Sequence, residues 1–299
     1  MTKFYSHGKL LLTGEYMVLR GADALAIPTK MGQSLEFESN DSKTLKWESW
    51  DSNNQLWFNT TFNLQDFSIS NTNDSEIAIR LAQILKVIRD QKNNFLRENG
   101  GKVKTHLEFD RHWGLGTSST LISNLARWSG VDPYELLQNS FGGSGYDIAC
   151  ATAKSPLVFR KQPLEPHVEK CAFDPPFKSS LYFVYLNQKK NSREAIESFK
   201  KQNIREEQIA YTSGLTRAVI RAHTLGEFEQ ILNEHEDFIS QILSLVPVKE
   251  KLFPDFQGAI KSLGAWGGDF ILATGDKHTP DYFKNKGFKI VTTYEEMFG

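Results

Sequence analysis

Residues 103–120 read VKTHLEFDRHWGLGTSST and hold three signals in a row. Val103 to Phe109 alternates apolar and polar side chains, which predicts a strand. The residues after Thr120 place apolar side chains at helical spacing, at Leu121, Ile122, Leu125, Ala126 and Trp128. A glycine loop therefore joins a strand to an amphipathic helix, which Gly130 closes.

The joining loop is Gly114-Leu115-Gly116-Thr117-Ser118-Ser119. Glycines let the backbone turn tightly and approach a ligand closely. The first turn of a helix offers unpaired N–H groups and the positive end of the helix dipole, which favour an anion such as phosphate. The three hydroxyl groups add donors or a Mg²⁺ ligand. The Gly-Lys-Ser/Thr of a Walker A loop is absent. An ordinary helix cap, which Ser and Thr commonly provide, stays open as the alternative.

Three further motifs could carry chemistry. The sequence GGSGYD at 142–147 could pass its backbone against a small ligand and present the carboxylate of Asp147, or Asp147 could simply cap a helix. Lys9 begins an apolar run that leads to Gly14-Glu15-Tyr16; a lysine there is either a functional cation or a solvated edge residue. The sequence GAWGGD at 264–269 suits either a tight turn or the close approach of a bound group.

The composition excludes several classes of partner. Lys plus Arg is 35 and Asp plus Glu is 36, a net charge of −1, which favours neither nucleic acid nor an anionic membrane surface. No uncharged apolar run is long enough for a bilayer, so we expect no membrane span. The N-terminus lacks a signal-peptide pattern and only Cys150 and Cys171 are present, so we expect a reduced, cytoplasmic protein. The seven histidines show no metal-binding spacing.

Strand and helix patterns are interleaved along the chain. Extended or strand patterns occur at 9–19, 24–37, 44–70, 157–159, 181–186, 270–274 and 288–293. Helical spacing occurs at 77–88, 205–223 and 227–245, and a short helix is expected after Asp132-Pro133. A length of 299 residues predicts about two domains, and the proline-rich segment 165–178 suggests domains 1–170 and 171–299. The mixture favours the α+β class.

Taken in order, the four motifs resemble those of the GHMP kinase superfamily, which includes galactokinase and the homoserine, mevalonate and phosphomevalonate kinases. GKLLLTGEYMVL (8–19), GSGYDIACA (143–151) and GAWGGDF (264–270) are most similar to the mevalonate and phosphomevalonate kinase branch. The resemblance implies an α+β, two-domain architecture. The N-terminal, ATP-binding domain would be like ribosomal protein S5 domain 2 and the C-terminal domain ferredoxin-like, with the active site between them.

The resemblance also implies an activity and roles for residues. The activity is ATP-dependent phosphorylation of a small anionic metabolite, with mevalonate or phosphomevalonate of isoprenoid biosynthesis as the first candidate. Asp147 would accept or orient the acceptor's proton, and Lys9 would lower the pKa of Asp147 and offset charge on the γ-phosphate. The ATP phosphates would be cradled by Gly114, Leu115, Gly116, Thr117, Ser118 and Ser119. Mg²⁺ would be held by Ser118 and Glu135, although the family's metal-binding glutamate aligns with Leu136. The substrate contacts would be Glu15, Tyr16, Ser144, Gly145, Lys190, Ser192, Arg193, Gly267 and Gly268.

Two departures from the family pattern stand out. Phe109 to Trp113 occupies the place where a proline usually precedes the glycine loop, and Trp266 stands where glycine is usual. An indole ring at that point would crowd a phosphate unless it turns away. Three other functions stay open: a GHMP kinase for a sugar or homoserine, a diphosphomevalonate decarboxylase-like enzyme, and a nucleotide-binding regulator without turnover. The expected partner is a small molecule rather than nucleic acid or membrane, and a homodimer is left open.

Overall fold

The computed structural model describes residues 1–188, 196–197, 199–264, 266 and 268–299. The chain forms two compact units. Unit 1 contains Met1–Gly8, Met31–Arg111 and Leu115–Thr152, and unit 2 contains Lys9–Lys30, His112–Gly114 and Ala153–Gly299. Each unit therefore draws on separate parts of the chain. The division into domains at residues 170 and 171 stays a prediction.

Unit 1 contains a sheet in which the strand order is β5-β4-β3-β6-β2. The strands are β2 (Ala24–Asn40), β3 (Thr44–Trp50), β4 (Leu56–Asn63), β5 (Ile69–Thr72) and β6 (Gly100–Leu107). β3 and β6 are parallel, and the other neighbours are antiparallel. β1 (Thr2–Leu11), which starts in unit 1 and ends in unit 2, pairs with β2. Leu45, Trp47 and Val103 are buried on one sheet face, because side chains alternate along a strand.

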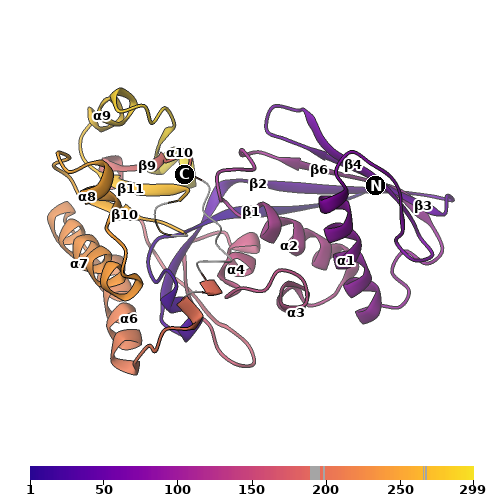
Figure 1. Cartoon of the computed structure of the whole chain (residues 1–299), viewed down its shortest axis with the longest axis horizontal. Coiled ribbons are helices and arrows are strands. Elements are labelled where there is room, and N and C mark those ends of the chain that lie inside the picture. The colour runs from indigo at the N-terminus through magenta and orange to yellow at the C-terminus, as the bar shows by residue number, and fades with distance from the viewer. Residues whose placement is uncertain (189–195, 198, 265, 267) are drawn as a thin grey trace. The chain divides into compact units, whose positions relative to one another are not determined.

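Helices α1 (Ser75–Gln91) and α2 (Thr117–Ser129) cover one face of this sheet (Figure 1). The predicted helical pattern at 77–88 is confirmed, and its apolar side chains join the core of unit 1. Asp74 begins α1, because its carboxylate accepts a hydrogen bond of 3.1 Å from the N–H of Ile77. The shorter helices α3 (Pro133–Gln138) and α4 (Tyr146–Thr152) complete the unit, and α4 packs against α2.

Unit 2 contains two groups of paired strands. The first residues of β2 pair with β7 (Leu157–Arg160), which pairs in turn with β8 (His167–Lys170). A second, antiparallel sheet has the order β10-β11-β9-β12. Its strands are β9 (Leu181–Tyr185), β10 (Ile260–Ser262), β11 (Phe270–Thr274) and β12 (Val291–Thr293).

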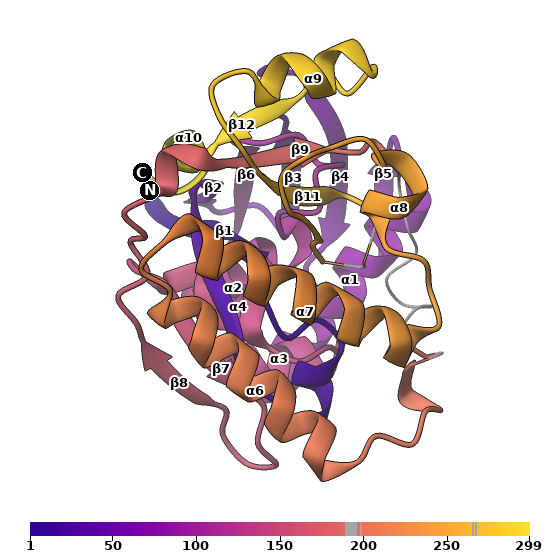
Figure 2. The same cartoon turned by 90° about the vertical axis from the view of Figure 1, so that its left-hand side faces the viewer.

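Helices α6 (Glu206–Arg221) and α7 (Leu225–Leu243) pack against each other in unit 2, and α7 also contacts β10 (Figure 2). They confirm the helices predicted at 205–223 and 227–245. The remaining short helices are η1 (Met17–Arg20), η2 (Lys178–Ser180), α8 (Val248–Leu252), α9 (Thr279–Asn285) and α10 (Tyr294–Phe298). Within the described ranges, no helix combines the length and the apolar character that a bilayer crossing needs.

The extended run predicted at residues 9–19 is wrong in its second half. β1 begins earlier, at Thr2, and ends at Leu11, and Met17–Arg20 forms η1. Gly14 has a φ of +82°, and a Cβ atom there would lie 2.7 Å from the Cβ of Ala24, so the turn requires glycine. Met17 and Val18 are buried in this turn, which explains why their apolar character resembled that of a strand.

Candidate active site

The glycine loop leads from β6 into α2, as the sequence predicted. Gly114 and Gly116 have φ values of +67° and +100°, a backbone conformation that favours glycine. Gly116 is the N-cap residue directly before α2, and it has no side chain with which to cap the helix. The hydroxyl of Ser119 instead donates to the carbonyl oxygen of Gly116 at 2.9 Å. The N-cap position is therefore held by glycine and not by Ser or Thr, so the capping alternative does not describe this loop.

Unit 2 brings together parts of three sequence motifs around Gly114. The Nζ atom of Lys9 donates a hydrogen bond of 2.8 Å to the carbonyl oxygen of Gly114. A Cβ atom on Gly114 would lie 2.0 Å from Oδ2 of Asp269, so the loop backbone passes directly against that carboxylate. Trp113 packs edge-on against Phe270 with ring centroids 5.9 Å apart. The N-terminal lysine, the start of the glycine loop and the C-terminal glycine motif are thus neighbours within one unit.

Asp147 belongs to unit 1 and lies in the first turn of α4. Gly143 and Gly145 before it have φ values of +120° and +96°. The carbonyl oxygen of Gly145 accepts the N–H groups of Ile148 and Ala149, so the helix has already begun before Asp147. Asp147 is therefore inside the helix and is not its N-cap; one carboxylate oxygen accepts the N–H of Ile148 at 3.1 Å. Ser144 is half-buried and Gly145 is buried in the same loop.

Glu15 and Tyr16 are both buried in the interior of unit 2. Oε1 of Glu15 is 2.6 Å from Nζ of Lys261, and neither side chain is exposed. Burial raises the pKa of Glu15 to about 7, although the Lys261 charge opposes this rise. The ring of Tyr16 packs on Phe199 at 5.4 Å, and burial raises its pKa to about 12. Contact of these two residues with the substrate stays a prediction.

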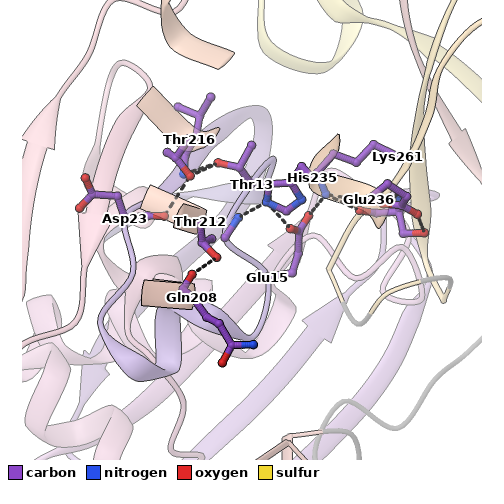
Figure 3. Close-up of polar contacts among 12 residues, drawn as sticks. Thr13, Glu15, Asp23, Gln208, Thr212, Thr216, His235, Glu236 and Lys261 are labelled. Carbon is purple, nitrogen blue, oxygen red and sulfur yellow. Dashed lines mark hydrogen bonds and ion pairs between the residues drawn. The ribbon is translucent and has the colours of Figure 1, made fainter. Parts of the chain in front are cut away.

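A buried polar network surrounds Glu15 (Figure 3). His235 on α7 accepts the N–H of Gly14 at 3.0 Å, and its Nε2 lies 3.6 Å from Oε2 of Glu15. Burial, with the nearby charge of Lys261, holds the pKa of His235 well below its usual value, so its ring is neutral. Glu236 accepts both the N–H and the hydroxyl of Ser262. Lys261, His235 and Glu236 escaped prediction, because His235 and Glu236 stand among many polar residues of α7 and nothing in the sequence marks them or Lys261 as buried.

The remaining predicted residues fall into three groups. Ser118 is exposed at the start of α2, and Glu135 is exposed on α3, while Leu136 is buried in the core. Gly268 is buried. Lys190, Ser192, Arg193 and Gly267 lie outside the described residues.

The indole ring of Trp266 is buried and is not exposed beside the glycine motif. Its side chain is 1% exposed and belongs to an apolar cluster that includes Tyr16, Met17, Phe199 and Ile239. Its φ of +58° is unusual for a non-glycine residue. The ring lies in the interior of unit 2. The structure therefore gives no reason to expect the clash between this ring and a phosphate that the sequence suggested.

The chain is similar to solved structures over nearly its whole length. No family model matches the sequence, and no curated protein sequence matches it. Three of the similar structures are mevalonate kinase from Methanococcus jannaschii, phosphomevalonate kinase from Streptococcus pneumoniae in complex with phosphomevalonate and AMPPNP, and galactokinase from Lactococcus lactis complexed with galactose. Their sequence identities to this chain are 16%, 15% and 13%, each with a TM-score of 0.70. The alignments cover 98% of this chain and 96%, 98% and 92% of the other three.

The similarity confirms the α+β class and the resemblance that the motifs predicted, at the level of the fold. Identities this low carry no information about the acceptor. The path of the chain, from the first strand through the glycine loop to the last glycine motif, is that of the fold shared by mevalonate kinase, phosphomevalonate kinase and galactokinase.

Proposed function

We propose that this protein is an ATP-dependent small-molecule kinase that phosphorylates a small anionic metabolite, with mevalonate or phosphomevalonate as the first acceptors to test. The observation that carries the proposal is the contact between Lys9 and Gly114. The ammonium group is held 2.8 Å from a carbonyl oxygen of the loop that leads into the uncapped start of α2. A cation held against a glycine loop is suited to a polyphosphate chain, and this loop continues along the chain into a helix start, which also favours anions.

The phosphates of ATP would bind at the start of α2. The residues proposed to cradle them are Gly114, Leu115, Gly116, Thr117, Ser118 and Ser119. Backbone N–H groups and the helix dipole supply the attraction. The hydroxyl of Ser119 is already used within the helix, whereas Ser118 is exposed. We therefore assign the hydroxyl contact with the nucleotide or its metal to Ser118 rather than to Ser119.

The residues present fit Mg²⁺ that arrives with the nucleotide. Among the described residues, no group of three or more His, Cys, Asp or Glu side chains could hold a metal ion. Mg²⁺ is commonly held by substrate phosphates, waters and one or two protein oxygens. Ser118 would be one such oxygen and Glu135 a second candidate. The bound ion would neutralise charge on the phosphates.

Lys9, in unit 2, and Asp147, in unit 1, are the residues to which we assign catalytic roles, because their motifs resemble those of GHMP kinases. Phosphoryl transfer needs positioning and charge neutralisation more than covalent catalysis. Asp147 would accept or orient the proton of an acceptor hydroxyl, and Lys9 would offset charge on the transferred phosphoryl group. If the acceptor is itself a phosphate, it is ionised at neutral pH, and Lys9 then contributes more than Asp147. Ser144, Gly145 and Gly268 are proposed acceptor contacts, and Lys190, Ser192 and Arg193 remain candidates from the sequence.

An ADP-release assay tests the function with mevalonate, phosphomevalonate, diphosphomevalonate, homoserine and galactose as acceptors. Release of ADP with mevalonate or phosphomevalonate supports the proposal. Release only with homoserine or galactose would move the protein to another branch of the same kinases. Release of CO₂ from diphosphomevalonate would identify a decarboxylase-like enzyme, and ATP binding with no turnover a regulator. A cytoplasmic location and a homodimer remain predictions.

A further inference from the structure

The ion pair between Glu15 and Lys261 is the most buried pair of opposite charges in the described part of the chain. The side chains of both residues are 0% exposed, and the two charged atoms are 2.6 Å apart. Lys261 also donates to the carbonyl oxygen of Ser262 at 3.0 Å. Oε2 of Glu15 has no hydrogen-bond partner among the described residues.

The groups that face this pair come from two places. His235 and Glu236 approach from α7, and Tyr16 belongs to the same turn as Glu15. Nζ of Lys261 is 3.9 Å from Oε2 of Glu236, so one buried cation lies between two buried carboxylates. Burial raises the pKa of Glu236 as well as that of Glu15, and the charge of Lys261 opposes both rises.

A pair of this kind is costly, because both charges lose their hydration and only part of that loss is recovered. Well-packed apolar residues of the same volume often serve stability equally well. The position of the Glu15–Lys261 pair in the chain suggests a role other than stability. Glu15 belongs to the turn that follows β1, the strand of Lys9, and Lys261 lies just before the glycine motif that begins at Gly264.

The same two segments are linked a second time. Tyr16 and Trp266, one from each segment, belong to one apolar cluster. The turn is also held from α6 and α7: the hydroxyl of Thr13 is 2.9 Å from that of Thr216, and the N–H of Gly14 donates to His235 (Figure 3). The turn is therefore tied to three other elements of unit 2.

We infer that Lys261 is a positioning residue, which through Glu15 holds the Gly14–Tyr16 turn and the C-terminal glycine motif in one fixed arrangement. This inference rests on the proposed kinase function. Lys261 acts on the reaction through the turn and through β1, on which Lys9 lies, and it touches neither nucleotide nor acceptor. Loss of the tie would displace reacting groups without removing any of them, and small displacements of that kind cost up to about 10²-fold in rate.

The test compares three forms of the full chain with the wild type. Lys261→Met removes one charge and leaves Glu15 buried without its cation. The double variant Glu15→Gln/Lys261→Met removes both charges and keeps the side-chain volumes similar. The matched control, Glu250→Gln/Lys251→Met, makes the same changes at two exposed positions on α8. Melting temperature, kcat, KM for ATP and amide hydrogen exchange of residues 14–20 are measured for each.

We expect Lys261→Met to lower both the melting temperature and kcat. The double variant should recover part of the melting temperature, because Glu15 is no longer left without its cation although Glu236 still is, while its kcat stays about 10²-fold low and its KM for ATP is unchanged. Exchange of residues 14–20 should be faster in the double variant than in the control. A double variant with wild-type kcat and wild-type exchange would overturn the inference.

The exchange measurement separates this inference from the proposed function. If no acceptor is phosphorylated by the wild type, the kinase proposal fails, but faster exchange in the double variant still supports the tie between Lys261 and the turn. Unchanged exchange overturns the tie whatever the activity assay shows.

Discussion

The backbone of Gly114 lies directly against the carboxylate of Asp269, 155 positions later in the sequence by subtraction (269 − 114). A Cβ atom on Gly114 would stand 2.0 Å from Oδ2 of Asp269, far inside van der Waals contact. Glycine is therefore required here by a neighbour as well as by its positive φ.

Replacing Gly114 by alanine should destabilise the protein by more than the cost of its backbone conformation alone. The φ of +67° costs a non-glycine residue about 1–2 kcal/mol, and the contact with Asp269 adds to this. Gly142→Ala is the matched control, because Gly142 has a φ of +68° and an added Cβ would meet nothing within 4 Å. Urea unfolding of both variants checks the difference. Equal losses would mean that the Asp269 side chain moves aside at no cost.

Lys9→Ala should lower kcat by at least ~10²-fold while the fold stays intact. The variant removes the cation that lies 2.8 Å from the carbonyl oxygen of Gly114. Lys3→Ala on the same strand is the control, since Lys3 is exposed and paired with Glu36. Steady-state kinetics with the preferred acceptor and circular dichroism are measured together. Wild-type turnover by Lys9→Ala would remove this residue from the mechanism.

Asp147→Asn should also lower kcat by at least ~10²-fold if the acceptor is a hydroxyl group. The asparagine keeps the size of the side chain and an oxygen that can accept the N–H of Ile148, so α4 should still form. With a phosphate acceptor the loss should be smaller, because no proton has to be removed. The check is kcat for mevalonate and for phosphomevalonate. An undiminished kcat with a hydroxyl acceptor contradicts the role.

Ser118→Ala should affect the Mg²⁺ dependence of the reaction, whereas Ser119→Ala should affect the stability of the fold. Ser118 is exposed, and as a metal-side oxygen its loss should weaken the apparent Mg²⁺ affinity by at least about 10-fold, since even outer contacts to metal ligands are worth that much. Ser119 donates to the carbonyl of Gly116, so its loss should cost about 1 kcal/mol of stability with little change in Mg²⁺ dependence. Titration of activity with Mg²⁺ and urea unfolding check the pair. The reverse pattern would exchange the two assignments.

The pH dependence of stability should reveal the buried carboxyl of Glu15. Its pKa is raised from 4.5 to about 7 in the folded protein. Between pH 4.5 and 7 the unfolded chain has lost this proton and the folded chain keeps it, so the contribution of Glu15 to stability falls as pH rises. The free energy of unfolding of the wild type minus that of Glu15→Gln should therefore decline over this range and be flat above it. A difference that is constant or rises with pH would show that Glu15 is ionised throughout.

The motifs were found in the sequence because each combines residues whose local behaviour is strong. Glycines at 114 and 116 before a helical pattern predicted the loop and α2, and both have positive φ. The apolar spacing of 77–88 predicted α1 for the same local reason. The resemblance carried by the motifs also predicted the fold.

The same reasoning did not foresee the burial of Glu15 and Tyr16. An acidic and an aromatic residue after a glycine are chemically suited to substrate binding, and the sequence contains no sign that both are buried. Their burial depends on Lys261, on Phe199 and on α7, which are all more than 180 positions away by subtraction (199 − 16 = 183 for the nearest of them). Trp266 shows the opposite case, since a residue that looked harmful for phosphate binding is turned into the core.

Local periodicity and glycine placement were enough to predict most of the strands and helices and the glycine loop before α2, because these depend on backbone sterics and on neighbours a few residues apart. Which polar groups are buried, and which lie next to Gly114, was settled by folding. Those outcomes depend on desolvation and on contacts between segments that are distant along the chain, and no local pattern encodes either of them.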